Sequence, residues 1–253
     1  MNIRGRPIAR LAVAAVVAVA AAVTGNGGAR AQTDGCATPP EMTETDIRFP
    51  HLAERLKAQQ PVSIVAIGGA STIGRAAGAP DLSYPYRLGR DLAQDFPHSP
   101  VVVTNKGVPR QSAKQMFERF ASDVIAEDPV LVLWEVGITD AVRATDVDEF
   151  VQTLQDGVDQ LKNRAIDTIL VDMQFSQSAA TVINFESYLK ALHQVGDLAE
   201  VYVFPRYAMM RYWSEQKVFN FDDVAAEDRA KLAARVYDCI GRKLAEIIRH
   251  GVQ

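Results

Sequence analysis

Five short apolar segments alternate with longer amphipathic segments from residue 61 to the end of the chain. The apolar segments are rich in Val, Ile and Leu, as in VSIVAIG at 62–68. The segments between them repeat apolar residues every three or four positions, which predicts helices. The predicted strands are 62–68, 101–105, 129–137, 167–173 and 200–205, and the predicted helices are 83–96, 112–128, 146–164, 179–196 and 226–250.

Strands that are almost wholly apolar and are separated by helices predict a parallel sheet covered on both faces. We therefore expect an α/β protein with a five-stranded parallel sheet between two layers of helices. Sheets of this kind carry their binding sites at the carboxyl ends of the strands. The places to search for chemistry are the strand-to-helix turns, at 68–75, 105–112, 137–145, 173–178 and 205–216.

The first 31 residues have the pattern of a secretory signal peptide. Three arginines precede the apolar run 11–23, and an Ala-x-Ala site predicts cleavage after Ala31. A membrane anchor is the alternative, but the run is short of the ~20 apolar residues that a spanning helix needs. We expect a periplasmic or secreted protein, with an N-terminal lead-in over 32–60 and one domain over 61–253.

Cleavage would leave 222 of the 253 residues, which suits one domain. Four of the 27 Lys and Arg and none of the 31 Asp and Glu precede Gln32, so the remaining formal charge is −8. An acidic domain without a basic run argues against a nucleic-acid partner. No later segment is apolar enough to form a stable membrane span. Export favours a disulfide between Cys36 and Cys239, with two free thiols as the alternative.

The first strand-to-helix turn, GGASTIG at 68–74, carries one serine, Ser71. A serine on such a turn is where a nucleophile can sit at the edge of an α/β sheet. The alternative is a turn that has kept this shape without the chemistry.

Several spaced blocks at the turns resemble the SGNH/GDSL hydrolase family, in particular its exported bacterial members. The blocks are IGGASTIG with SYPYRL after it, NKGVPRQSA, LWEVGITDAV and DRAKLAARVYDCIGRKLA, with MQF at 173–175 and RYAMMRYW at 206–213 as further segments. The resemblance covers about residues 62–248 and implies a flavodoxin-like three-layer sandwich with ester hydrolase activity, of the esterase, lipase or carbohydrate deacetylase type. It also implies a serine nucleophile, an oxyanion hole that includes a Gly amide and an Asn amide, and a late Asp-x-x-His that supplies the base.

The serine block departs from the family pattern at its chemical position. The pattern Gly-Asp-Ser-x-Thr-x-Gly is matched in frame by Gly68, Thr72 and Gly74. In this frame Ala70 takes the place of the serine, and Ser71 is one residue late. Moving the frame to Ser71 loses the Thr match and the final Gly match.

The other three chemical positions depart as well. Arg110 stands at the oxyanion Gly, Thr139 at the oxyanion Asn and Lys231 at the histidine, while Asp228 keeps the Asp position. The four histidines lie elsewhere and are expected to be solvated: His51, His98, His193 and His250.

Four departures at chemical positions indicate a lost mechanism. The first hypothesis is therefore a pseudoenzyme that binds at the old cleft, with Arg110, Thr139 and Lys231 as ligand-binding residues. These cations suit an anionic small molecule or glycan, and a periplasmic protein is the other candidate partner.

Two other hypotheses remain. One is an active ester hydrolase in which Ser71 attacks and Lys231 acts as base, with a pKa lowered by burial or by Arg110 and opposed by Asp228. The other is a structural or assembly protein for which the fold is only a scaffold. We expect no cofactor and no metal, because the acidic segment 219–228 has no His or Cys at metal-ligand spacing. Glu135 and Asp172 could be site groups or ordinary loop partners.

Overall fold

The computed structural model describes residues 1–2 and 35–253. A five-stranded parallel sheet, with strand order β2-β1-β3-β4-β5, runs through residues 35–253. This is the flavodoxin-like order, so the predicted fold class is confirmed. The strands are β1 (Val62–Gly68), β2 (Val101–Gly107), β3 (Leu131–Glu135), β4 (Asp167–Val171) and β5 (Tyr202–Phe204).

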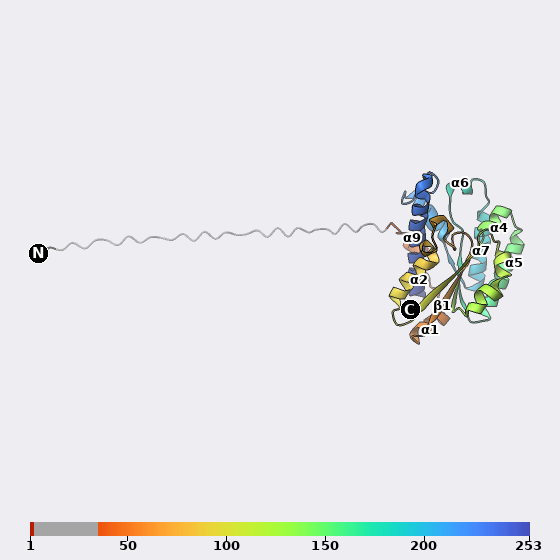
Figure 1. Ribbon diagram of the computed structural model, residues 1–253, viewed down its shortest axis with the longest axis horizontal. Coiled ribbons are helices and arrows are strands. Elements are labelled where there is room, and N and C mark those ends of the chain that lie inside the picture. The colour runs from red at the N-terminus through yellow and green to blue at the C-terminus, as the bar shows by residue number, and fades with distance from the viewer. Residues whose placement is uncertain (3–34) are drawn as a thin grey trace. The chain divides into compact units, whose positions relative to one another are not determined.

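Helices cover both faces of the sheet, as the sequence predicts. They are α1 (Pro50–Lys57), α2 (Tyr84–Asp95), α3 (Ala113–Phe117), α4 (Ile138–Arg143), α5 (Val147–Lys162), α6 (Gln177–Ala180), α7 (Glu186–Ala199), α8 (Arg206–Glu215) and α9 (Arg229–Gly251), with short 3-10 turns at 40–42, 75–77, 80–82, 125–127 and 226–228. Side chains of α1, α2, α8 and α9 join the core on one face, and those of α3, α5 and α7 join the core on the other. Figure 1 shows α2 and α9 on one side of the sheet and α5 and α7 on the opposite side.

The strands supply side chains to both cores because successive residues of a strand point to opposite faces. Ile64 of β1 packs in the core on the side of α2 and α9, whereas Val65 and Ile67 pack on the side of α5. All three are inaccessible to solvent, and full burial stabilises each by about 1.5–3 kcal/mol. Double-sided burial explains why β1 and β3 read as nearly continuous apolar runs.

The segment predicted as one helix over 112–128 is broken in the structure. α3 ends at Phe117, and a π-helical turn over Phe120–Val124 is followed by a 3-10 turn. The π turn places Phe120 edge-on against Trp134, with 4.8 Å between ring centroids. Arg119 donates to the Lys106 carbonyl on β2 at 2.6 Å. Tertiary packing on Trp134 and β2 therefore overrides the simple helical period.

The segment expected to be a turn at 205–216 contains helix α8 instead. Four of its residues are buried at helical spacing: Arg206, Met209, Met210 and Trp213. Because the first of these positions is an arginine, the apolar stripe that is typical of a helix was not recognised from the sequence. The predicted helix 179–196 is also revised, because α6 and α7 are separate helices.

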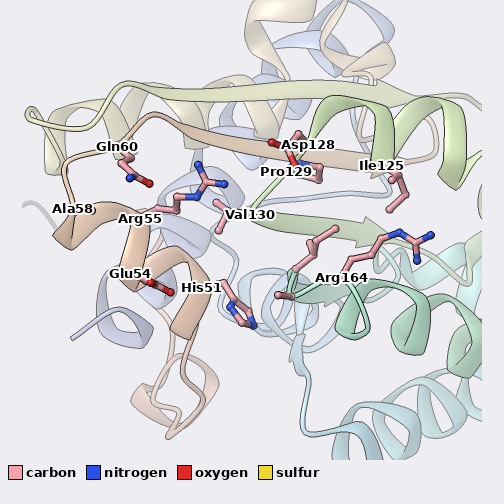
Figure 2. Close-up of a pocket in the computed structure, with 12 residues that line it drawn as sticks. His51, Glu54, Arg55, Ala58, Gln60, Ile125, Asp128, Pro129, Val130 and Arg164 are labelled. Atoms are coloured by element: carbon pink, nitrogen blue, oxygen red, sulfur yellow. The ribbon is translucent and has the colours of Figure 1, made fainter.

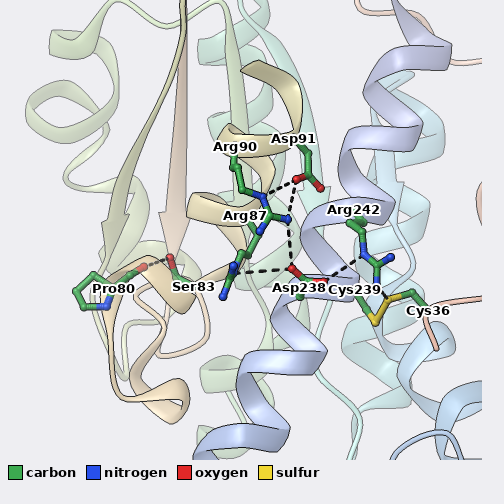
Figure 3. Close-up of polar contacts among 9 residues, drawn as sticks. All are labelled: Cys36, Pro80, Ser83, Arg87, Arg90, Asp91, Asp238, Cys239 and Arg242. Atoms are coloured by element: carbon green, nitrogen blue, oxygen red, sulfur yellow. Dashed lines mark hydrogen bonds and ion pairs between the residues drawn. A yellow bond between two sulfur atoms is a disulfide. The ribbon is translucent and has the colours of Figure 1, made fainter. Parts of the chain in front are cut away.

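A disulfide joins Cys36 to Cys239, with 5.1 Å between the Cα atoms, and confirms the predicted pairing. Both cysteines are buried, and Figure 3 shows them next to Asp238 of α9, whose carboxylate lies 3.3 Å from both Arg90 and Arg242. The predicted signal peptide falls outside the described residues. Within residues 35–253, no helix has the length and hydropathy needed to cross a membrane.

Candidate functional site

A pocket of about 350 Å³ opens at the carboxyl ends of β1 and β3. This is the edge at which parallel sheets bind their ligands. We call it the cationic pocket, because two arginines lie on its wall. It is lined by Gly69, Ala70, Ser71, Arg110, Glu135, Ile138, Thr139, Val142, Arg143 and Gln174.

The turn after β1 presents Ala70, and not Ser71, to solvent. Ala70 is exposed, whereas Ser71 is only 5% exposed. Gly68 permits the close packing beneath this turn, because a Cβ there would lie 2.1 Å from Thr72 Oγ1 and 2.7 Å from Glu135 Cβ. Ala70, the residue at the in-frame nucleophile position, therefore presents only a methyl group to the pocket.

The hydroxyl of Ser71 takes part in a buried network around Glu135. Ser71 Oγ donates to Glu135 Oε1 at 2.7 Å, and Thr72 Oγ1 donates to Glu135 Oε2 at 2.5 Å. The hydroxyl of Tyr84 lies 3.0 Å from Thr72 Oγ1. Burial, followed by the charge of Glu135, raises the pKa of Tyr84 well above its usual value, so its phenol stays neutral. Glu135, which the sequence left undecided, is therefore the centre of a buried polar cluster.

Arg206 supplies the charge that balances Glu135. Its side chain is 1% exposed, and its Nη1 lies 3.0 Å from Ser71 Oγ and 3.4 Å from Glu135 Oε2. A buried carboxylate needs such a partner, since an isolated buried charge is costly. Sequence reasoning missed this residue, although an arginine within the buried stripe of a helix was the available signal.

Arg110 stands on the wall of the cationic pocket in a backbone conformation that suits glycine. Its φ is +66°, in the left-handed region that a residue with a side chain occupies at a cost of about 1–2 kcal/mol. Arg143 Nη2 donates to the Arg110 carbonyl at 2.9 Å, and Arg143 Nη1 donates to Gln115 Oε1 at 3.1 Å. Among residues 35–253, no carboxylate forms an ion pair with either arginine, although the charge of Arg143 acts on the neighbouring carboxyl of Asp140.

Thr139 lies in the first turn of α4 and lines the same pocket. The next residue, Asp140, is 2% exposed. The Ala113 N–H donates to both of its carboxylate oxygens, at 3.2 and 3.1 Å. Burial raises the pKa of Asp140. This contact ties α4 to α3 and fixes the wall that carries Thr139.

Lys231 and Asp228 are not brought to the pocket. The Lys231 side chain is 80% exposed, and its Nζ lies 3.2 Å from Asp228 Oδ1 at the start of α9. Neither residue lines the cationic pocket. Of the three predicted ligand-binding residues, the structure therefore brings together Arg110 and Thr139 but leaves Lys231 in solvent, where it pairs with its helical neighbour.

One histidine approaches a buried carboxylate, although away from the pocket lining. His193 Nε2 lies 3.4 Å from Asp172 Oδ2, and Tyr207 donates its N–H to Asp172 Oδ1 at 2.7 Å. Burial raises the pKa of Asp172, opposed by the hydrogen bond from His193. Since neither residue lines the pocket of Ser71, they form no catalytic triad with it.

A second cavity of about 290 Å³ adjoins the first and shares Gln174 with it. We call it the apolar pocket. Side chains of α8, α9 and the loops after β4 and α8 form its walls. Its apolar and aromatic lining residues are Ala76, Phe175, Met210, Phe221, Val224, Leu232, Ala233, Val236 and Tyr237.

A wider cavity of about 670 Å³ lies at the opposite end of the sheet (Figure 2). It is bounded by α1 and by the loops that lead into β3 and β4, with His51, Arg55, Asp128 and Arg164 around it. Ligands of parallel sheets bind at the carboxyl ends of the strands, and this cavity lies at the amino ends. Over residues 35–253 no group of three or more His, Cys, Asp or Glu is placed to hold a metal ion.

The strand order and the position of the pocket define an α/β protein of the SGNH hydrolase type. Residues 35–253 match the sequence profile of the non-GDSL lipase-like family. The chain therefore belongs to this family, and the expected relationship to SGNH/GDSL hydrolases is confirmed. A search of curated proteins finds no significant match.

Solved structures with the same fold are esterases or their relatives. A protein assigned to the G-D-S-L lipolytic family from Desulfitobacterium hafniense is 21% identical, with a TM-score of 0.58 over 74% of this chain and 99% of that one. An acetylxylan esterase from Geobacillus stearothermophilus is 19% identical, with a TM-score of 0.60 over 74% and 94%. A two-domain esterase active on acetylated mannans is 17% identical, with a TM-score of 0.62 over 79% of this chain and 53% of that one. At these identities the likeness establishes the fold.

Proposed function

We propose that this protein is an exported binding protein on an ester hydrolase fold, which holds an anionic ligand in the cationic pocket without hydrolysing it. The observation that carries the proposal is the orientation of the serine turn. Ala70 faces the pocket, while Ser71 is buried with its hydroxyl bound to Glu135 and Arg206. A methyl group at the nucleophile position cannot attack an ester carbonyl.

The ligand class follows from the charges that line the pocket. Glu135 is already balanced by Arg206, whereas Arg110 and Arg143 line the pocket and form no ion pair among residues 35–253. Guanidinium groups bind carboxylates and phosphates through charge-assisted hydrogen bonds. The open pocket also favours binding over a purely structural role, because nothing in residues 35–253 fills it.

The alternative hydrolase would need Ser71 and Lys231 within hydrogen-bond reach. Lys231 is 80% exposed and contacts Asp228, and it does not line the pocket that holds Ser71. This geometry therefore gives the alternative no support. The lead-in residue Cys36 and its disulfide support export, since disulfides persist in oxidising compartments.

Two measurements on the purified protein test the proposal. A serine-directed fluorophosphonate should not label it, and labelling that Ser71→Ala abolishes would contradict the loss of catalysis. Calorimetric titration with butyrate and with inorganic phosphate should show binding that weakens at least tenfold in Arg110→Gln, as expected for a lost charge-assisted contact. The matched control is Arg211→Gln, an exposed arginine on α8 that pairs with Glu215. Equal losses in both variants would argue against the pocket.

A further inference from the structure

The apolar pocket has no role in binding a small anion, and its lining points to a different part of the ligand. Phe175, Met210, Phe221, Leu232 and Val236 give it an apolar wall. Tyr237 adds a phenol, and burial raises its pKa to about 12, so no charge arises there at neutral pH. A cavity with this lining stabilises hydrocarbon, at about 25 cal/mol per Å² of apolar surface removed from water.

The charged residues at the edge of the apolar pocket leave this character intact. Asp222 lies on the edge, and its carboxylate accepts hydrogen bonds from Ser176 Oγ at 3.2 Å and from the Gln177 and Ser178 N–H groups at 3.2 and 3.0 Å. Arg229 donates Nε–H to the Val224 carbonyl at 3.3 Å. Both groups therefore have partners in the surrounding loop, and they stand at the edge of a wall that is otherwise mostly apolar.

The two pockets adjoin each other at a single residue. Gln174, which is exposed, lines both of them. A ligand that extends past Gln174 would therefore place one end beside Arg110 and the other among the side chains of α8 and α9. The two ends of the site differ in chemistry, since one is cationic and the other is hydrocarbon.

We propose that the ligand is an anionic amphiphile, a free alkyl carboxylate whose head binds Arg110 in the cationic pocket and whose chain occupies the apolar pocket. The proposal rests on the proposed function and adds the length and polarity of the ligand to it. Charge complementarity favours this direction, because Arg110 and Arg143 both line the cationic pocket, whereas Arg229 shares the apolar pocket with the carboxylate of Asp222. A free alkyl carboxylate is the kind of molecule that an ester hydrolase releases as a product, and here it would stay bound as a ligand.

A chain-length series tests this directly. The purified protein is titrated calorimetrically with butyrate, hexanoate, octanoate and decanoate. Each methylene group that enters the apolar pocket should tighten binding about fourfold, until the cavity is filled and the affinity levels off. Octanol, which has the chain without the charge, should bind at least tenfold more weakly than octanoate.

Two substitutions on the same helix separate the chain from the head. Ala233→Phe fills the apolar pocket and should abolish the dependence on chain length while butyrate binding is unchanged. Ala230→Phe, at an exposed position of α9 outside both pockets, should preserve the dependence. If Ala233→Phe does not fold, as judged by circular dichroism, Val224→Asp in the loop before α9 serves instead, because it places a negative charge against the chain.

The outcomes distinguish this inference from the proposed function. Binding of butyrate through Arg110 without any increase along the series would overturn the amphiphile and leave the anion site standing. Loss of chain dependence in Ala230→Phe as well as Ala233→Phe would also overturn it. Absence of binding for every anion would reject the proposed function itself.

Discussion

The part of the site around Ser71, which we call the serine side, is buried, whereas the part around Lys231, which we call the base side, is exposed. On the serine side, Ser71, Glu135 and Arg206 form a buried cluster held by hydrogen bonds and an ion pair at the sheet edge. On the base side, Lys231 and Asp228 are 80% and 56% exposed and contact each other. The serine side is part of the core and must stay paired, because unpaired buried charge is costly. The base side contributes nothing to the core, and no such cost holds it in place.

The largest expected effect tests whether the buried cluster depends on its charge pair. Arg206→Met leaves Glu135 buried without a cation, which should cost about 3–5 kcal/mol in the free energy of unfolding. Lys231→Met should cost less than about 0.5 kcal/mol, since exposed ion pairs contribute little. Urea unfolding of both variants gives the comparison. The double variant Arg206→Met with Glu135→Gln should recover most of the loss, and similar costs for Arg206 and Lys231 would remove the distinction between the two sides.

A smaller effect tests whether Ser71 is a structural residue. Ser71→Ala removes one donor to Glu135 and one acceptor for Arg206, which should cost about 1–3 kcal/mol because both partners remain buried. Thermal and urea unfolding measure it. Ser214→Ala on α8 is the control, at a position outside the cluster. A Ser71→Ala variant as stable as wild type would show that the hydroxyl is not held by the network.

Much of the fold was predictable, because it depends on the period of apolar residues. The central strands β1, β3 and β4 are buried on both faces, and β1 has the predicted bounds. The prediction failed where one side chain decides the backbone, as at the π turn that seats Phe120 on Trp134. At α8 it failed because Arg206 interrupts an apolar pattern, and only its pairing with Glu135 makes an arginine compatible with that position.

The site was predictable in position but only partly in content. A motif frame fixes spacing along the chain, so it identified Ala70, Arg110 and Thr139 as neighbours at the sheet edge. It could not show that Lys231 points to solvent, because the orientation of a side chain on the first turn of α9 depends on the loop before it. It gave no indication of the apolar pocket, which is assembled from residues of five separate segments.

A third effect concerns the backbone at Arg110, one of the two arginines that line the cationic pocket beside the serine side. Arg110→Gly relieves the left-handed φ, worth about 1–2 kcal/mol, but increases the flexibility of the unfolded chain by about 0.5–1 kcal/mol. We expect stability to change by less than about 1 kcal/mol. Val108→Gly, at a neighbouring position without a positive φ, should lose about 1 kcal/mol. Equal losses in the two variants, measured by urea unfolding, would show that Arg110 is not strained.

The smallest effect is a pair of pH dependences with opposite signs, from Asp140 on α4 and from Asp222 at the edge of the apolar pocket. Hydrogen bonds, first that of the Ser178 side chain, lower the pKa of Asp222 in the exposed loop before α9. Its contribution to stability is therefore present above the unfolded pKa of about 3.9 and is lost as the pH falls through the lower folded pKa. Burial raises the pKa of Asp140 beside Thr139. Its contribution is present below the unfolded pKa and is lost as the pH rises through the folded pKa.

Thermal unfolding of Asp222→Asn and Asp140→Asn between pH 3.5 and 7 distinguishes the two pH dependences. This range brackets the unfolded Asp pKa of about 3.9. Relative to Asp222→Asn, the wild type should gain stability as the pH rises, by well under 1 kcal/mol because the loop is in water. Relative to Asp140→Asn, which keeps an acceptor for the Ala113 N–H, the wild type should lose stability over the same range. Slopes of the same sign would show that the pKa values of Asp140 and Asp222 do not shift in opposite directions. The contrast between buried and exposed parts of the site would then rest on the exposed pair of Lys231 and Asp228 alone.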